Sequence, residues 1–146
     1  MPERIALVMA RDLSSDRRSE IPGLFERFFA SGVVIGDLAD KALVGISFNM
    51  DEDGAFRYGV GRIVTRAPDS VPAGFETLTL PAGDYAVFRH FGPVSKLPPL
   101  FDRIFSEWLP ESGYALREDP VIERYPDDER NGPNGMAFEI WVPIKR

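Results

Sequence analysis

The sequence IPGLFERFF, at Ile21–Phe29, returns as LPPLFDRIF at Leu97–Phe105, 76 residues later. This offset is about half of the 146-residue chain. In each segment the apolar side chains recur at helical spacing and a proline stands in the first turn, which is typical of an amphipathic helix. The repetition predicts two copies of one small unit. Two related halves form a cleft between them, and a cleft is a natural place for a ligand.

Runs of apolar and alternating residues around each helix predict strands, and clusters of Gly, Pro, Asn and Asp predict the turns between them. The Asp-Gly pair at Asp53–Gly54 favours a hairpin turn within residues 51–54. The expected strands are residues 5–10, 42–50, 56–65, 75–80, 85–91, 121–125 and 136–144, and the expected helices are residues 21–30 and 97–109, the second ended by Pro110.

Each half then contains a strand, a helix and a two-stranded hairpin, with an extra strand at residues 75–80. This pattern predicts an α+β fold, with antiparallel strands and with helices on one face. A chain of 146 residues suits one compact domain. We expect a single domain with repeat one at about residues 1–70 and repeat two at about residues 71–146.

Composition and charge exclude several classes of protein. The net charge is −6, whereas a nucleic-acid-binding protein usually carries a basic patch, so we expect no nucleic-acid binding by this chain. The absence of cysteine excludes disulfides and thiol catalysis, and a single histidine, His90, argues against a His-based metal site. No apolar run approaches the about 18 residues of a membrane span, and the first residues do not form a signal peptide. We expect a cytoplasmic protein without metal or cofactor.

The last predicted strand carries an acid and a large aromatic side chain on one face. Side chains alternate along a strand, so Phe138, Ile140 and Val142 face the helices, and Glu139 and Trp141 share the other face. The carboxylate supplies charge, and the indole ring supplies cation–π attraction of about 0.5–2 kcal/mol. The pair predicts a site for a flat organic cation. The alternative is a solvated glutamate on an open sheet face.

The same spacing of acid and aromatic recurs at Glu123 and Tyr125, on the partner strand of the predicted hairpin. If the two strands pair, we expect these residues on the same face as Glu139 and Trp141. Phe48 holds the position of Tyr125 in the first half. The alternatives are surface exposure for the acid and ordinary sheet packing for the rings.

Three further aromatic residues are candidates for lining a ligand site. Trp108 falls near the end of the second helix, where core packing is the better interpretation of its spacing. Tyr85 begins a strand directly after a turn, and Tyr58 stands between Arg57 and Gly59. Packing is the alternative for these two tyrosines as well.

Several segments of the second half are typical of one known family. In their order and spacing they resemble the GyrI-like small-molecule-binding domain, also called the effector-binding domain of AraC- and MerR-type transcription regulators. Two shorter segments of the first half resemble the first repeat of that family. The segments are Gly83–Pro93, Glu107–Tyr114, Pro120–Tyr125 and Phe138–Ile144 in the second half, and Gly45–Phe48 and Arg57–Tyr58 in the first.

The resemblance implies two fused strand-helix-strand-strand modules, packed about a pseudo-twofold axis, with a pocket between them for bulky, often cationic or aromatic compounds. It implies a carboxylate on the last strand at the pocket centre, and the matching residue is Glu139. In many members an Asp follows the Arg-Tyr pair; here Gly59 stands there, which predicts one acid fewer and more room. No helix-turn-helix segment precedes the domain in this sequence, so we expect a stand-alone sensor or sequestering protein.

Two other functions stay open beside small-molecule binding. Some GyrI-like proteins hydrolyse strained electrophilic compounds, and a glutamate desolvated beside aromatic rings can act as a general base toward water. In that case Glu139 would be the catalytic residue. The third is a protein-interaction module of the gyrase-inhibitor kind, with an unknown protein partner. Common catalytic and phosphate-binding motifs are absent from the sequence, which favours the binding interpretation.

Overall fold

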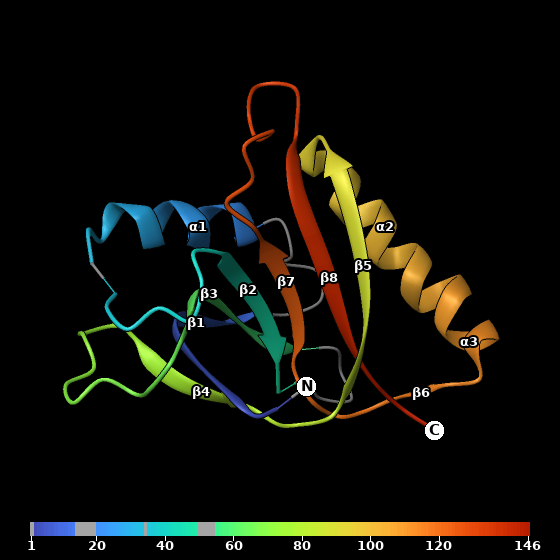
Figure 1. The fold of residues 1–146 in the computed structure, drawn as a ribbon, viewed down its shortest axis with the longest axis horizontal. Helices are drawn as coiled ribbons and strands as arrows, with labels where there is room; N and C mark the ends of the chain where they lie inside the picture. Colours follow the sequence, from blue (N-terminus) through green and yellow to red (C-terminus); the bar gives the residue numbers. More distant parts are fainter. Residues whose placement is uncertain (1, 14–19, 34, 50–54) are drawn as a thin grey trace.

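The computed structural model describes residues 2–13, 20–33, 35–49 and 55–146, and it forms one antiparallel sheet with helices against it (Figure 1). The strands lie in the order β4-β1-β3-β2-β7-β8-β5, and β6 also pairs with β8. The strands are β1 (Arg4–Leu13), β2 (Leu43–Phe48), β3 (Phe56–Val64), β4 (Glu76–Leu80), β5 (Asp84–Gly92), β6 (Ala115–Leu116), β7 (Val121–Tyr125) and β8 (Met136–Lys145). The helical segments are α1 (Ile21–Ala30), η2 (Val94–Lys96), α2 (Leu97–Arg103), η3 (Ile104–Trp108) and α3 (Leu109–Ser112).

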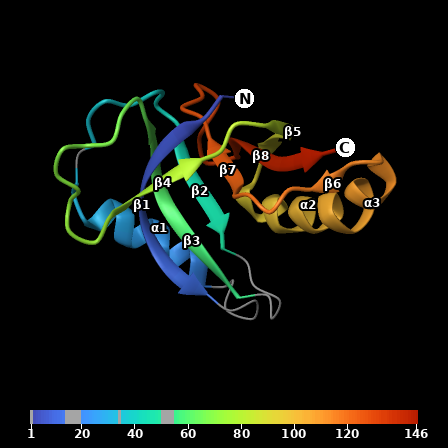
Figure 2. The same ribbon diagram turned by 90° about the horizontal axis from the view of Figure 1, so that it is seen from below.

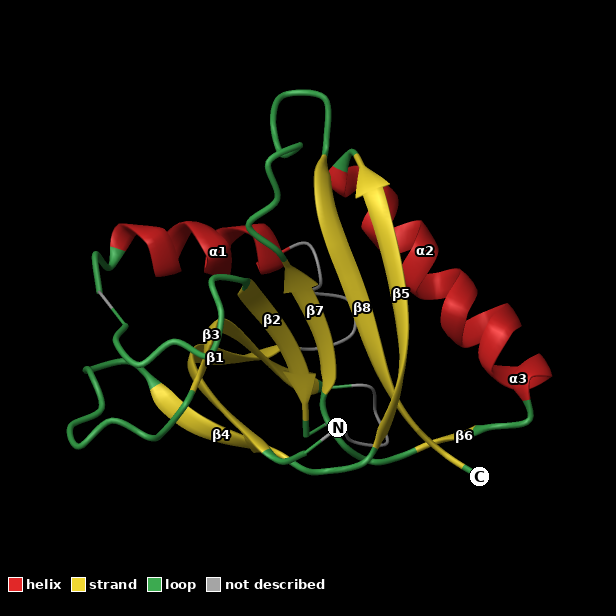
Figure 3. Cartoon of the chain, in the orientation of Figure 1, coloured by secondary structure: helices red, strands yellow, loops and turns green. Residues whose placement is uncertain are grey.

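The α+β fold predicted from the sequence is confirmed, and the predicted strands and helices all occur within a few residues of their expected ends (Figure 3). Two neighbouring strands, β2 and β7, join the first half of the chain to the second through backbone pairing. The short strand β6 was not predicted, because two residues carry no periodicity. The predicted hairpin turn at residues 51–54 lies outside the described residues.

Both long helices cover the same face of the sheet (Figure 2). On this side α1 packs on Tyr58 and Val60, and α2 packs on Phe138 and Ile140. We call this side the helix face. The other side, which we call the opposite face, has its own buried apolar cluster, to which Ile46, Ile122 and Val8 belong.

Pro110 does not end the second helix, contrary to the prediction. A π-helical turn, η3, precedes α3, and Pro110 then lies in the first turn of α3, where a missing N–H is tolerated. The helix ends instead at Gly113, whose φ of 82° is left-handed and therefore suits glycine. None of the described helices has the length and apolar character needed to cross a membrane.

Gly59 does not leave extra room for a ligand, as its place in the sequence suggested. A Cβ at this position would stand 2.8 Å from a methyl carbon of Val8, on the neighbouring strand β1. The space is therefore already filled by the apolar cluster of the opposite face. Glycine is needed here because two strands pack closely, which is one of its usual roles within a sheet.

Candidate functional site

The pairing of β7 with β8 separates the candidate residues onto two faces. Glu123 lies opposite Ile140, and Arg124 lies opposite Glu139. Directly opposed residues share a face, so Glu123 is on the helix face and Glu139 is on the opposite face. The prediction that both acid-aromatic pairs share a face is wrong. Glu123 pairs with Ile140 and not with Glu139 or Trp141, and a difference of one residue in register exchanges the faces.

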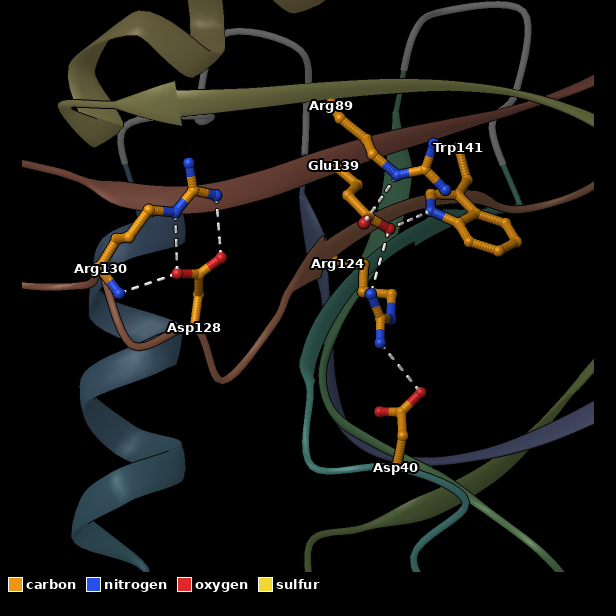
Figure 4. Close-up of polar contacts among 7 residues, drawn as sticks. All are labelled: Asp40, Arg89, Arg124, Asp128, Arg130, Glu139 and Trp141. Carbon is orange, nitrogen blue, oxygen red and sulfur yellow. Dashed lines mark hydrogen bonds and ion pairs between the residues drawn. The ribbon is translucent and has the colours of Figure 1, made fainter.

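Glu139 is buried, with 8% of its surface exposed, and two guanidinium groups contact it (Figure 4). The Nε atom of Arg89 lies 3.3 Å from one carboxylate oxygen, and an Nη atom of Arg124 lies 3.2 Å from the other. The indole N–H of Trp141 donates a hydrogen bond of 2.9 Å to that second oxygen. Arg124 also reaches Asp40 at 3.3 Å, which extends the network to the loop before β2.

These contacts favour a structural role for Glu139. A carboxylate already compensated by two cations and held by an indole N–H gains less from a third cation than an uncompensated one would. For the same reason it is poorly suited to removing a proton from water, as a general base must. The contacts of Glu139 join β5, β7 and β8 and hold these three strands relative to one another.

Glu123 is equally buried, at 7% exposed, and its contacts include tyrosine hydroxyls. Tyr58 donates to the carboxylate at 3.2 Å and Tyr125 donates at 3.1 Å. Burial raises the pKa of both tyrosines, and the negative charge of Glu123 raises each pKa further. Both hydroxyls therefore stay protonated at neutral pH and remain able to donate to the carboxylate.

Helix α1 places an aromatic ring over this carboxylate and its tyrosines. The ring of Phe25 lies edge-on to Tyr125, with centroids 5.6 Å apart, and tilted to Tyr58 at 6.2 Å. We call the four residues Phe25, Tyr58, Glu123 and Tyr125 the Glu123 cluster. A Cβ at Gly45 on β2 would overlap the hydroxyl of Tyr58 and stand 3.3 Å from the Phe25 ring, so glycine is required there.

Sequence reasoning missed Phe25 and Gly45. Phe25 belongs to the apolar stripe of its helix, and nothing in that stripe distinguishes a ring over a carboxylate from one in the core. A glycine inside a strand often marks the close approach of another group, which is the signal that Gly45 carried. That signal does not name the approaching group, because Tyr58 comes from a different strand.

The remaining predicted site residues lie apart from the Glu123 cluster. Trp108 packs against Phe88, with ring centroids 4.9 Å apart, in the apolar layer beneath α2. Phe48 is 5% exposed within the buried cluster of the opposite face. Tyr85 lies beside Trp141 on the opposite face, with centroids 6.0 Å apart. The structure thus brings Tyr58, Glu123 and Tyr125 together, and it separately brings together Tyr85, Glu139 and Trp141.

The described residues offer no group of three or more His, Cys, Asp or Glu side chains that could hold a metal ion. They form a groove of about 410 Å³ beside Tyr85 and Trp141, and an apolar hollow of about 270 Å³ between α1 and the loop that follows it.

Comparison with known proteins identifies the family. The family model of the GyrI-like small molecule binding domain matches residues 1–145. The chain belongs to the GyrI-like small molecule binding domain family. The resemblance noted from the sequence is thereby confirmed over nearly the whole chain.

Two curated relatives in this family bear on the role of the chain. It is 29% identical over 92 residues to the probable transcriptional regulator YgiV of Escherichia coli strain K12. The aligned segment covers 62% of this chain and 57% of that protein. It is 31% identical over 80 residues to a DNA gyrase inhibitor of Erwinia billingiae strain Eb661. This aligned segment covers 52% of this chain and 50% of that protein. The chain spans about half the length of the curated relatives it matches.

A solved structure of the same fold contains a ligand. The protein SAV2435, bound to tetraphenylphosphonium, matches with a TM-score of 0.75 at 21% sequence identity. The match covers 99% of this chain and 90% of that chain. At this identity the likeness shows the fold.

Proposed function

We propose that this GyrI-like domain binds bulky hydrophobic cations at the Glu123 cluster, with Glu123 as the counter-charge. The observation that carries the proposal is a buried carboxylate held by two tyrosine hydroxyls beneath the ring of Phe25. The family is one of small-molecule-binding domains, and a protein of the same fold is bound to the cation tetraphenylphosphonium. The family description supports a small-molecule ligand, and the solved structure supports a cationic one.

The residues of the cluster suit such a ligand physically. A cation whose charge is spread over a large apolar body loses little hydration when it is buried, so a carboxylate in a medium of low dielectric attracts it strongly. The faces of aromatic rings carry partial negative charge and add cation–π attraction. The hydroxyls of Tyr58 and Tyr125 orient the carboxylate, which keeps the charge in place before the ligand arrives.

Phe25 is the member of the cluster that we propose to move. Its ring belongs to the surface helix α1 and is half-buried, whereas Tyr58 is fully buried. A ligand that reaches Glu123 would displace this ring and then take over its contacts with Tyr58 and Tyr125. Replacement of Phe25 by alanine should therefore speed association with a bulky cation, measured by stopped-flow fluorescence.

The test is a calorimetric titration with tetraphenylphosphonium. Glu123→Gln should weaken binding at least tenfold, because it removes the buried negative charge and keeps the shape of the side chain. Glu139→Gln is the matched control, a buried glutamate on the other face of the same hairpin, and it should change the affinity less than threefold. The opposite result, a large loss with Glu139→Gln alone, would favour the residue named by the sequence resemblance and reject Glu123.

A second ligand separates charge from shape. Tetraphenylborate has nearly the size and surface of tetraphenylphosphonium but the opposite charge. The wild-type protein should discriminate strongly in favour of the cation, and Glu123→Gln should reduce that discrimination. Equal discrimination in the two proteins would remove Glu123 as the counter-charge while leaving hydrophobic binding intact.

We further propose that binding serves sensing or sequestration, as expected from the sequence. The likeness to a protein named as a probable transcriptional regulator supports sensing. Sequestration predicts that cells producing the chain tolerate more tetraphenylphosphonium than cells producing Glu123→Gln at the same level. Equal tolerance of the two strains would contradict it.

The relative named as a DNA gyrase inhibitor supports a second candidate, inhibition of gyrase by this chain. The match covers about half of each protein. Purified chain in excess should then suppress supercoiling of relaxed plasmid by gyrase. Full supercoiling at high protein excess would reject this candidate and leave the binding proposal untouched.

A further inference from the structure

A groove at the edge of the sheet has no part in the proposed cation site. It lies along β5 and β8 near the end where β6 joins, and its volume is about 410 Å³, within the range of small-molecule sites. The apolar residues Tyr85, Val87 and Trp141 line one side of it, and Tyr114 and Ile144, which belong to the cluster of the helix face, line the other. The charged residues that line it are Asp84 and Arg146. By strand register, Tyr85, Val87 and Trp141 belong to the opposite face, away from Glu123.

Two of the three aromatic rings that line the groove, those of Trp141 and Tyr85, are held in place by contacts outside it. Trp141 donates its indole N–H to Glu139, which the two arginines hold in turn (Figure 4). The guanidinium of Arg117 lies 4.9 Å from the centre of the Tyr85 ring. Arg117 is itself anchored on two backbone carbonyls of the turn that leads into β5, at 3.2 and 2.9 Å. These contacts position both rings beside the groove before any ligand binds, which lowers the entropy lost on binding.

The hydroxyl of Tyr85 is a polar group next to the groove. Its oxygen is buried and has no hydrogen-bond partner among the described residues, which is uncommon for a buried hydroxyl. Burial raises the pKa of Tyr85, and the nearby positive charge of Arg117 offsets that only in part. The hydroxyl therefore stays protonated at neutral pH and can donate a hydrogen bond.

We infer that this groove is a second ligand site, for a planar aromatic molecule that carries a hydrogen-bond acceptor. The flat ring packs against Trp141 and Tyr85. A small shift of the Tyr85 ring then exposes its buried hydroxyl, which donates to the acceptor the hydrogen bond that it lacks within the protein. Two arginines compensate Glu139, which accepts the hydrogen bond of Trp141. Arg146 and Asp84 both line the groove, so an anionic acceptor such as a carboxylate is placed beside Arg146 and away from Asp84. The preferred ligand thus differs in charge and shape from a bulky cation.

The test uses 2-naphthoate as the probe, in calorimetric titrations of the full chain. Tyr85→Phe removes only the hydroxyl oxygen and should raise the dissociation constant about tenfold, the loss expected for one hydrogen bond in a buried site. Glu123→Gln, and wild-type protein saturated with tetraphenylphosphonium, should bind 2-naphthoate as the untreated wild type does. Thermal unfolding of Tyr85→Phe confirms that the variant is folded.

Tryptophan fluorescence reports where the probe binds. The chain has two tryptophans, so Trp108→Phe leaves Trp141 as the only one, and 2-naphthoate should change its emission with the calorimetric dissociation constant. Binding that Tyr85→Phe leaves unchanged, binding lost with Glu123→Gln, or no binding at millimolar probe would each overturn the inference. A failure of tetraphenylphosphonium to bind would instead count against the proposed function and leave this result standing.

Discussion

Glu123 and Glu139 are the same residue type at almost equal exposure, yet their surroundings give them different chemistry. Glu139 contacts two guanidinium groups and an indole N–H. Glu123 receives hydrogen bonds from two tyrosine hydroxyls under an aromatic ring. Two cations contact Glu139, whereas tyrosine hydroxyls are among the partners of Glu123, and on this difference we base the proposal that Glu123 attracts a ligand cation.

Gly45 provides a test of the geometry at Glu123. Gly45→Ala adds a methyl group that overlaps the Tyr58 hydroxyl, so it should lower the free energy of unfolding by about 1–3 kcal/mol and weaken tetraphenylphosphonium binding. The control is Gly23→Ala on α1, where nothing stands within 4 Å of the new methyl group. It should stabilise by about 0.4–1 kcal/mol, because alanine favours the helix. Urea denaturation of both variants measures the difference, and equal effects would contradict the close approach.

The raised pKa values of Tyr58 and Tyr125 predict a loss of stability in alkali. When folding raises the pKa of a tyrosine, the folded state holds its proton more tightly than the unfolded state. The contribution is fully present below about pH 10, the unfolded value, and falls by about 1.4 kcal/mol per pH unit for each tyrosine above it.

Urea denaturation between pH 9 and 11 measures this slope. Tyr125→Phe should make the fall less steep, because one of the two linked protons is removed. Tyr114→Phe removes a tyrosine hydroxyl outside the Glu123 cluster and is the matched control. If Tyr125→Phe kept the wild-type slope, the linkage between Tyr125 and Glu123 would be refuted.

At the scale of elements, the network around Glu139 fixes three strands together. Arg124→Met removes one guanidinium from the buried carboxylate and breaks the contact with Asp40, so it should lower the free energy of unfolding by about 1–3 kcal/mol. Arg103→Met removes an ion pair with Glu107 whose side chains are 75% and 66% exposed, and it should change stability by less than about 0.5 kcal/mol. Chemical denaturation of the two variants makes the comparison. Similar losses would show that the network adds nothing beyond a surface ion pair.

The helices were predictable as elements because their signals are local. An apolar stripe and a proline in the first turn identified both α1 and α2. The end of the second helix was not predictable, since a π-helical turn moved Pro110 into a position that tolerates it. A turn of this kind depends on packing along the whole helix, and a single proline does not reveal it.

At the scale of the whole molecule, β2 and β7 pair across the two halves, and Tyr58 of the first half bonds Glu123 of the second. The single domain expected from the sequence therefore predicts one cooperative unfolding transition. Both tryptophans lie in the second half, whereas circular dichroism reports on the entire chain. The two signals should give the same midpoint in urea. Separate midpoints would indicate halves that unfold independently.

The sequence by itself determined which segments form strands and helices and which family the chain belongs to, because apolar periodicity, turn residues and motif order are local properties. It also determined that Phe138, Ile140 and Val142 lie under a helix, since alternation along one strand requires no partner. Only the tertiary structure decided that Glu123 contacts Tyr58 and Tyr125 and that Glu139 contacts Trp141. The face of a residue relative to another strand depends on register, and a shift of one residue reverses it, as between Glu123 and Glu139. Phe25 and Gly45 lie beside the other residues of the Glu123 cluster because segments distant in the sequence pack together, which the sequence alone does not show.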